Sequence, residues 1–467
     1  MTSNQSRRNF LKETLLTTAA GWTLSVDQAL NAAQTTASGL HIAPFKFDVT
    51  PPIGHSCCGG WIKPIEVVDD ALEAVGIVLL GAGKPIVLCA VDWTGLLNEA
   101  HVEWRTALAQ AAGTTADRVA VHCVHQHNAP MACLEAERIV AAEGDLPHVL
   151  MVDFFKRCLD AGRDAVAKAV KQARPVTHIG HGQGKIEGIA SNRRVHRDES
   201  GKVIAMRGSA CTDPKLIALP DGLIDPFLKT VAFFDGEKKV ASLHYYATHP
   251  MSYYADGRAT SDFAGLARKQ RQQDEPDCLH VYFTGCAGNV SAGKYNDGSK
   301  AARPVLTKRL YDGIVASEAK LERMSVNGES LAWKTAEILP PPLKSLHAEK
   351  LAQQVSTKTS GVVYRNRPSY MLSWLHRVEK RIPIVLSSLH IGGVKLLHLP
   401  AESFIEYQLR AQDFAKDNFV CTAAYGDGGP WYIPVKEEYP NGGYEVSVAF
   451  CEPEIDDVMT EGMRRIL

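Results

Sequence analysis

Short β-rich segments alternate with amphipathic helical segments along most of this 467-residue chain, and this alternation is the feature that most constrains its fold. Three β-hairpins are predicted: 75–80 with 85–91, 230–234 with 240–246, and 384–389 with 394–399. Hairpins pair antiparallel, whereas strands separated by a helix usually pair in parallel. We therefore predict an α/β fold with mixed β-sheets and flanking helices, not a purely parallel doubly wound sheet.

The remaining elements follow from the same periodicities. Further strands are predicted at 118–125 and 280–284, and helices at 97–112, near 146–172, at 262–274 and at 454–467. Pro340-Pro341-Pro342 is the one conspicuous break, and we expect a surface excursion there, followed by a helix of about 15 residues. Without an internal repeat or a low-complexity linker, residues 39–467 are predicted to form a single large domain.

Composition excludes several classes of protein. The chain is 45% hydrophobic and 22% charged, which is typical of a folded globular protein, and 51 basic against 52 acidic residues give a net charge of −1. This balance lacks the basic excess of nucleic-acid-binding proteins. No apolar run reaches the roughly 18 residues of a membrane span, so we expect no transmembrane segment in the mature chain. The eleven cysteines show no CxxC spacing, which argues against a cysteine-built zinc site and a fully disulfide-bridged scaffold.

The N-terminus resembles an export signal. Arg7-Arg8 precedes a mildly apolar stretch through Leu24 and an alanine-rich exit at Ala29, Ala32 and Ala33. This order is typical of a twin-arginine signal, so residues 1–38 are predicted to be a signal and linker. An amphipathic helix is the alternative. Export would place the protein in the periplasm or outside the cell, with the twin-arginine machinery as a partner.

Two predicted strands end on histidines. His122, His125 and His127 lie at the end of 118–125, and His249 follows 240–246 directly before Pro250. In an extended chain, residues 125 and 127 would share one face, and paired imidazoles bind a metal or transfer protons. Pairs of this kind also occur as structural or surface residues. His122 and His244 are predicted to face the core.

Candidates from other side-chain classes follow later in the chain. Glu402 comes just after a strand and a proline, and glycine-rich loops present Tyr432 and Tyr444. Aromatic side chains in such loops commonly serve packing. The small-residue loop 285–293 contains Ser291, and it suits either an oxyanion-binding nest with a nucleophilic serine or a close-packed turn.

Taken in order, these segments resemble the catalytic domain of the neutral, non-lysosomal ceramidase family, from about residue 40 to 455. His125-Gln-His-Asn-Ala-Pro130 is similar to the family's His-Thr-His-Ser-Gly-Pro, and Pro400-Ala-Glu402 to its Pro-Gly-Glu. Thr248-His249 resembles the segment of the second zinc histidine, and Asn192-Arg193 a pair whose arginine lies in the active site. Tyr432 and Tyr444, twelve residues apart, match its two functional tyrosines.

The resemblance implies a zinc-dependent amidohydrolase that cleaves a ceramide-like or other N-acyl amide through a metal-activated water. Its implied Zn²⁺ ligands are His125, His249, Glu402 and Tyr432. The implied catalytic residues are His127, Arg193 and Tyr444, with Ser291 as a further candidate. The family's Gly-Asp-Val-Ser-Pro-Asn is Gly288-Asn-Val-Ser-Ala-Gly293 here, which weakens the case for Ser291 as a nucleophile.

Alternatives remain open at this point. The chain is too short for the family's C-terminal immunoglobulin-like domain, and no long apolar lipid groove can be traced in the sequence. A zinc-dependent hydrolase or lyase acting on a glycan or glycoconjugate is the second hypothesis. A catalytically silent metal-binding protein is the third. The partner is expected to be a small-molecule or lipid substrate, and the sequence does not indicate the oligomeric state.

Overall fold

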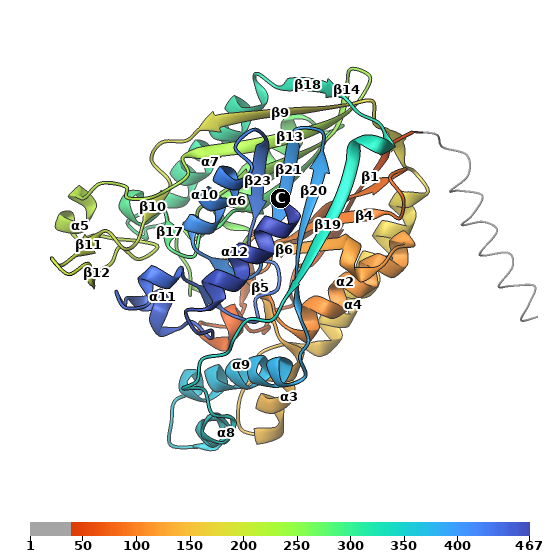
Figure 1. Cartoon of the computed structure of the whole chain (residues 1–467). Helices are drawn as coiled ribbons and strands as arrows, with labels where there is room; N and C mark the ends of the chain where they lie inside the picture. The colour runs from red at the N-terminus through yellow and green to blue at the C-terminus, as the bar shows by residue number, and fades with distance from the viewer. Residues whose placement is uncertain (1–38) are drawn as a thin grey trace, which may run out of the picture.

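Three larger β-sheets form the framework of the protein in a computed structural model, which describes residues 39–467 (Figure 1). The predicted α/β architecture with mixed sheets is confirmed. The export signal predicted for residues 1–38 lies outside the described residues.

The first sheet contains the first predicted hairpin. Its order is β6 (Val119–Cys123), β4 (Ile86–Val91), β3 (Glu73–Leu80), β1 (His41–Asp48) and β8 (Arg174–Pro175). Strands β3 and β4 pair antiparallel, and β6 returns parallel to β4 after helix α2 (Glu99–Ala112). Helices α2 and α4 (Val152–Val170) cover this sheet, and Trp104 of α2 and Phe155 of α4 pack against each other and against Trp93.

The second sheet runs in the order β16 (Leu279–Thr284), β14 (Lys238–Tyr246), β13 (Phe227–Asp235), β9 (His178–Lys185) and β18 (Glu322–Ser325). Helices α6 (Asp262–Asp274) and α7 (Ala302–Glu318) pack on it. Strand β9 carries Gly180, Gly182 and Gly184 on the face toward α7 and the residues that follow it. A Cβ on Gly182 would lie 2.4 Å from the carbonyl oxygen of Ser317, so the helix backbone rests directly on the strand.

The third sheet has the order β19 (Leu331–Ile338), β20 (Ile384–Ile391), β21 (Val394–His398) and β23 (Phe419–Ala423). The predicted hairpin across Gly392-Gly393 is β20 with β21, and β23 pairs parallel to β21. Helix α12 (Ile455–Ile466) packs on β19 and β20, and α10 (Ile405–Phe414) contacts β23.

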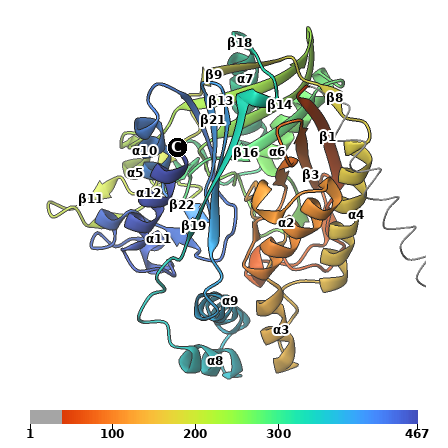
Figure 2. The same ribbon diagram turned by 45° about the vertical axis from the view of Figure 1, so that its right-hand side comes forward.

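Helices α3 (Leu134–Glu143), α8 (Ala348–Ser356) and α9 (Val362–Glu379) form a lobe below the sheets (Figures 1 and 2). The prediction of a single helix of about 15 residues after Pro340–Pro342 is therefore wrong. Two helices occupy this stretch, and they are separated at 357–361, where Thr-Lys-Thr-Ser-Gly favours a turn over a helix.

Short strand pairs and helices complete the structure and carry the loops described below. They are β5 (Gly95–Leu96) with β7 (Met131–Ala132), β10 (Ser191–Asn192) with β17 (Val290–Ser291), β11 (His196–Arg197) with β12 (Val203–Ala205), β15 (Arg258–Ala259) with β2 (Val67–Val68), β22 (Glu402–Ser403) with β24 (Tyr432–Ile433), α5 (Pro214–Ala218) and α11 (Tyr444–Ser447).

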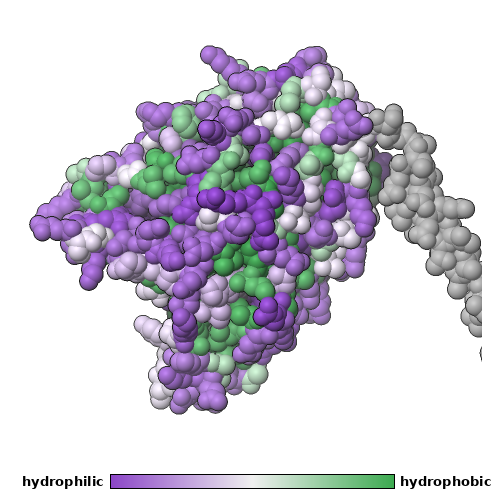
Figure 3. Space-filling model, viewed as in Figure 1, coloured by the Kyte–Doolittle hydropathy of each residue, from purple (hydrophilic) through white to green (hydrophobic). Residues whose placement is uncertain are grey.

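Hydrophilic residues cover most of the face drawn in Figure 3, with hydrophobic residues in separate areas between them. Within residues 39–467, no helix combines the length and apolar character needed to cross a membrane. All eleven cysteines carry free thiols, and all except Cys211 are buried.

Candidate metal centre

His125 lies in a loop directly after β6. The strand ends at Cys123, and the amides of Val124 and His125 donate to the carbonyls of Val91 and Trp93 over 2.8 and 2.9 Å. His125 itself has a φ of 75°. The expectation that His125 and His127 share a face through the two-residue period of a strand is therefore wrong, because the chain is not extended there. The loop brings both side chains to one site by turning.

His249 and Glu402 reach the same place from the segments that follow β14 and β21 of the other two large sheets. His249 lies just beyond the end of β14, and its amide donates to the carbonyl of Val290 over 3.0 Å. Glu402 begins β22, which pairs parallel to β24 and sets Glu402 beside Tyr432. Segments that follow strands of the three large sheets thus each place one side chain at a common point.

The donor atoms of these three residues converge. The Nε2 atoms of His125 and His249 are 3.2 Å apart, and Glu402 Oε2 lies 3.3 Å from the first and 3.2 Å from the second. The Nδ1 atom of each ring is hydrogen-bonded to a backbone carbonyl. His125 contacts the carbonyl of Thr94 at 2.6 Å, and His249 contacts that of Ala287 at 2.8 Å. These hydrogen bonds assign the proton to Nδ1, so both Nε2 lone pairs face inward.

This arrangement fits a bound metal ion. Two nitrogen lone pairs and a carboxylate oxygen, nearly inaccessible to water, would repel one another without a cation between them. Ligands held tetrahedrally at roughly 2.0–2.1 Å from zinc are about 3.3 Å from one another, close to the three distances above. Carbonyl acceptors behind the imidazoles are also the usual outer support of metal-binding histidines. The donor set of two nitrogens and one oxygen suits zinc.

His127 completes a cluster of three histidines whose nitrogens lie within 4.8 Å of one another. Its ring centroid is 5.1 Å from that of His125 and 5.7 Å from that of His249, and its buried Nε2 has no hydrogen-bond partner among the described residues. Burial, reinforced by His125 and His249, holds the pKa of His127 well below its usual range. A neutral imidazole with a free nitrogen can accept a proton at this position.

Arg193, Tyr432 and Tyr444 lie together next to the cluster, where the Tyr432 ring stacks on that of His249 at 6.5 Å between centroids. Arg193 Nη1 donates to the Tyr432 hydroxyl over 3.4 Å, and its guanidinium lies 5.5 Å from the centre of the Tyr444 ring. The two tyrosine rings meet edge to face at 5.7 Å. Tyr432 is buried and Tyr444 is 44% exposed, so the group extends from the site to solvent.

Glu445 connects this group to a second arginine. Its buried carboxylate lies 3.4 Å from Arg193 Nε and 2.8 Å from Arg194 Nη1. Arg194 in turn contacts Glu438 at 2.7 Å. Arg193 is therefore held by an acidic partner beneath it.

Ser291 uses its hydroxyl in backbone hydrogen bonds. Its Oγ donates to the Gly208 carbonyl over 2.9 Å and accepts from the Gly293 amide over 3.3 Å. The residue is buried on β17 next to the His249 backbone. These contacts resemble those of a close-packed turn, which was the second of the two interpretations of the loop 285–293.

Tyr425 belongs to the site although no sequence signal indicated it. Its ring stacks on His125 at 4.2 Å, and its hydroxyl is 3.3 Å from His249 Nδ1. It has a φ of 60°, directly before Gly426. Tyr425 also lines a small cavity of about 20 Å³ that adjoins His125 and Glu402, and whose other walls include Met131 and Trp431.

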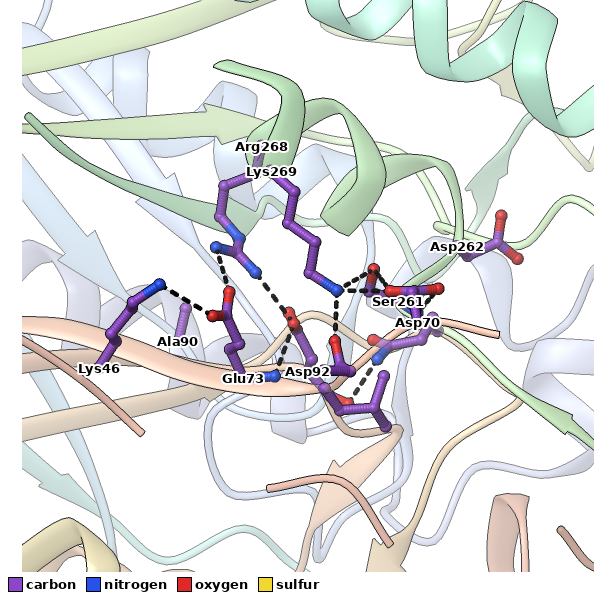
Figure 4. Close-up of polar contacts among 12 residues, drawn as sticks. Lys46, Asp70, Glu73, Ala90, Asp92, Ser261, Asp262, Arg268 and Lys269 are labelled. Atoms are coloured by element: carbon purple, nitrogen blue, oxygen red, sulfur yellow. Dashed lines mark hydrogen bonds and ion pairs between the residues drawn. The ribbon is translucent and has the colours of Figure 1, made fainter. Parts of the chain in front are cut away.

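A buried ionic network anchors the His125 loop from below. The Arg268 guanidinium on α6 contacts Asp92 at 3.1 Å and Glu73 at 3.0 Å (Figure 4). The carbonyl of Asp92 accepts a hydrogen bond from the side chain of Gln126, the residue between the two histidines. The loop is thus tied to β3 and α6, which favours a fixed arrangement of the histidines.

Comparisons with known proteins support the fold. No protein-family model matches the chain, and no curated protein matches it significantly by sequence. Two solved structures match over 92% of this chain and 74% of theirs at 15% identity: neutral ceramidase from Pseudomonas aeruginosa, with a TM-score of 0.65, and a ceramidase complexed with C2, with a TM-score of 0.66. The described residues therefore adopt the fold of neutral ceramidase.

Proposed function

We propose that this protein is a zinc-dependent hydrolase of amide bonds, in which water adds across the C–N bond to give a carboxylic acid and an amine. The observation that carries the proposal is the convergence of two imidazole Nε2 atoms and one carboxylate within 3.3 Å of one another in a ceramidase fold. Zinc bound there would lower the pKa of a water and polarise the amide carbonyl.

The chain's own groups have separate tasks in this proposal. His125, His249 and Glu402 hold the metal, with Tyr432 as the fourth ligand. Arg193, fixed by Glu445, stabilises negative charge that develops on the carbonyl oxygen. His127 accepts and returns a proton through its free Nε2.

Tyr444 occupies the solvent-facing side, where it donates a hydrogen bond to the intermediate or to the leaving amine. We leave Ser291 out of this set, because its hydroxyl already has two backbone partners.

The proposed substrate class rests on the likeness in fold. Both matched structures are described as ceramidases, so we propose a ceramide-like or other N-acyl amide as substrate. We also propose export through the twin-arginine route to the periplasm or the exterior, on the basis of Arg7-Arg8 and the apolar stretch after them.

Metal analysis tests the proposal. We expect about one zinc per chain in the wild-type protein and less than about a tenth of that in His125→Ala and His249→Ala, because each loses a nitrogen donor. Exposed His347 before α8 provides the control, and His347→Ala should keep its zinc.

Hydrolysis of a panel of N-acyl amides is then followed by mass spectrometry of the products. We expect turnover by the wild type and His347→Ala, and none after chelation or in the two site variants. A zinc-free native protein, or full activity in His125→Ala, contradicts the proposal. Zinc binding without turnover of any amide indicates instead the glycan-directed or the catalytically silent alternative.

A further inference from the structure

Arg367 on α9 is an arginine without a counter-charge. Its guanidinium lies over the indole ring of Trp61 at 5.4 Å. Among the described residues it has no ion-pair or hydrogen-bond partner, although the side chain is partly buried and its Nε is shielded from solvent. A guanidinium that lies over an aromatic ring donates no hydrogen bond to it, and its unpartnered N–H groups are suited to binding an oxyanion.

Trp61 connects this arginine to the surroundings of the candidate metal centre. The indole is fixed by a 3.2 Å hydrogen bond from its Nε1 to Asn366, and it packs against Trp431 at 5.0 Å between ring centroids. Trp431 lines the small cavity that adjoins His125 and Glu402. Arg367, Trp61 and Trp431 therefore form a row of contacts from α9 to the cavity beside the candidate metal centre.

Tyr370, which follows Arg367 by three residues on α9, gives a second indication of this position. Its ring meets that of Trp61 at 6.0 Å and that of Trp431 at 5.8 Å between centroids. Helix α9 thus packs against both indoles, although it belongs to the lobe of α3, α8 and α9 (Figure 2).

The other arginines at the site differ in their partners. Arg193 and Arg194 share the Glu445 carboxylate, and Arg194 also pairs with Glu438. Their charges are compensated within the protein. The charge of Arg367 is not, so an anionic group arriving with the substrate would meet no competing carboxylate.

We propose that Arg367 binds an oxyanion of the substrate, and that the preferred substrates are amides carrying a carboxylate or a phosphate close to the scissile bond. This inference rests on the proposed amide hydrolysis and specifies which amides are preferred as substrates. It distinguishes this protein's substrates from uncharged N-acyl amides of the same chain length.

The test compares charged and neutral members of matched pairs. N-acylglycine is compared with its methyl ester, and N-acyl phosphoethanolamine with N-acylethanolamine, each with short and long acyl chains. We expect the wild type to prefer the anion in at least one pair. Arg367→Leu should reduce kcat/KM for that anion about 10- to 100-fold, the range expected for hydrogen bonds to a charged group, and leave the neutral partner unchanged.

Two further variants separate recognition from folding. Arg464→Leu removes an arginine that likewise lies over an aromatic ring, Phe414 at 4.5 Å, and should keep the preference. Arg367→Lys keeps the charge without the fork and should restore part of the preference. Which pair shows the effect identifies the carboxylate or the phosphate.

The outcomes separate this inference from the proposed function. Hydrolysis without a preference for the anion, or a preference that survives in Arg367→Leu, overturns the inference and leaves amide hydrolysis standing. If no amide is hydrolysed, the proposed function fails, and calorimetric binding of N-acylglycine decides the role of Arg367. Weaker binding to Arg367→Leu than to the wild type supports the oxyanion site, and equal or absent binding overturns it.

Discussion

The carboxylate of Glu445 compensates two buried guanidiniums at once. It lies 3.4 Å from Arg193 and 2.8 Å from Arg194, and the side chain is inaccessible to solvent. Removing one partner of a buried ion pair leaves an uncompensated charge in a medium that solvates it poorly. Glu445 therefore matters for stability as well as for the position of Arg193.

Glu445→Gln should lower the free energy of unfolding by about 3–5 kcal/mol, the usual cost of breaking a buried pair from one side. Urea denaturation followed by circular dichroism measures this change. The exposed pair Glu461–Arg465, with 4.0 Å between its charged atoms, provides the control. Glu461→Gln should change stability by less than about 0.5 kcal/mol. Equal effects of the two substitutions would contradict the role given to Glu445.

At the scale of secondary-structure elements, the packing of strand β9 against α7 depends on the strand's glycines. Gly182 and Gly184 let the end of α7 approach so closely that a Cβ would lie 2.4 Å from the Ser317 carbonyl and 2.7 Å from the Gly313 carbonyl. Both contacts are with backbone atoms, which cannot rotate away. The helix would have to move as a whole.

Gly182→Ala should therefore destabilise the protein by about 1–3 kcal/mol, as overpacking of a close contact does. Thermal unfolding monitored by calorimetry would show a lower Tm. Gly393 in the β20–β21 turn has no positive φ, and a Cβ added there would have no neighbour within 4 Å. Gly393→Ala is thus a matched control, with a Tm close to that of the wild type. An unchanged Tm in Gly182→Ala would show that the helix can shift at little cost.

The same strand shows where prediction from sequence ends. The hairpins of β3 with β4, β13 with β14, and β20 with β21 were predictable, because their hydrophobic runs and turns are local signals. Strand β9, His-Ile-Gly-His-Gly-Gln-Gly-Lys, has no such run, and its glycines make sense only against α7. Its pairing with β13 depends on contacts far apart in the sequence.

The residues of the candidate site likewise divide into those that the sequence predicts and those that it does not. His125, His249 and Glu402 follow predicted strands, and the structure brings these three together. Tyr425 and Arg367 were not predicted, because each is close to the site only through packing. Tyr425 follows two alanines with no motif around it, and Arg367 lies on a helix of the lobe.

The whole molecule contains eleven thiols and no disulfide within residues 39–467. Burial raises the pKa of most of these thiols, Cys57 and Cys421 to about 12. Cys211 is the one cysteine that is not fully buried. Thiolate formation, and with it oxidation, is disfavoured at the buried positions.

We therefore expect a thiol reagent to modify about one cysteine rapidly in the native protein, because reactivity follows exposure. All eleven should react after unfolding without a reductant. Intact-protein mass spectrometry counts the modified residues, and Cys211→Ser should abolish the rapid reaction. Fewer than eleven modified residues in the unfolded, unreduced chain would reveal a disulfide.

The three converging donors, at positions 125, 249 and 402, each follow a strand of a different large sheet, namely β6, β14 and β21. The shortest continuous segment that contains all three runs from residue 125 to residue 402, and it includes every strand of the second sheet. A short segment of the chain therefore cannot supply the three donors on its own. The proposed metal binding would therefore require the described domain to be assembled first, so that metal uptake would report completed folding.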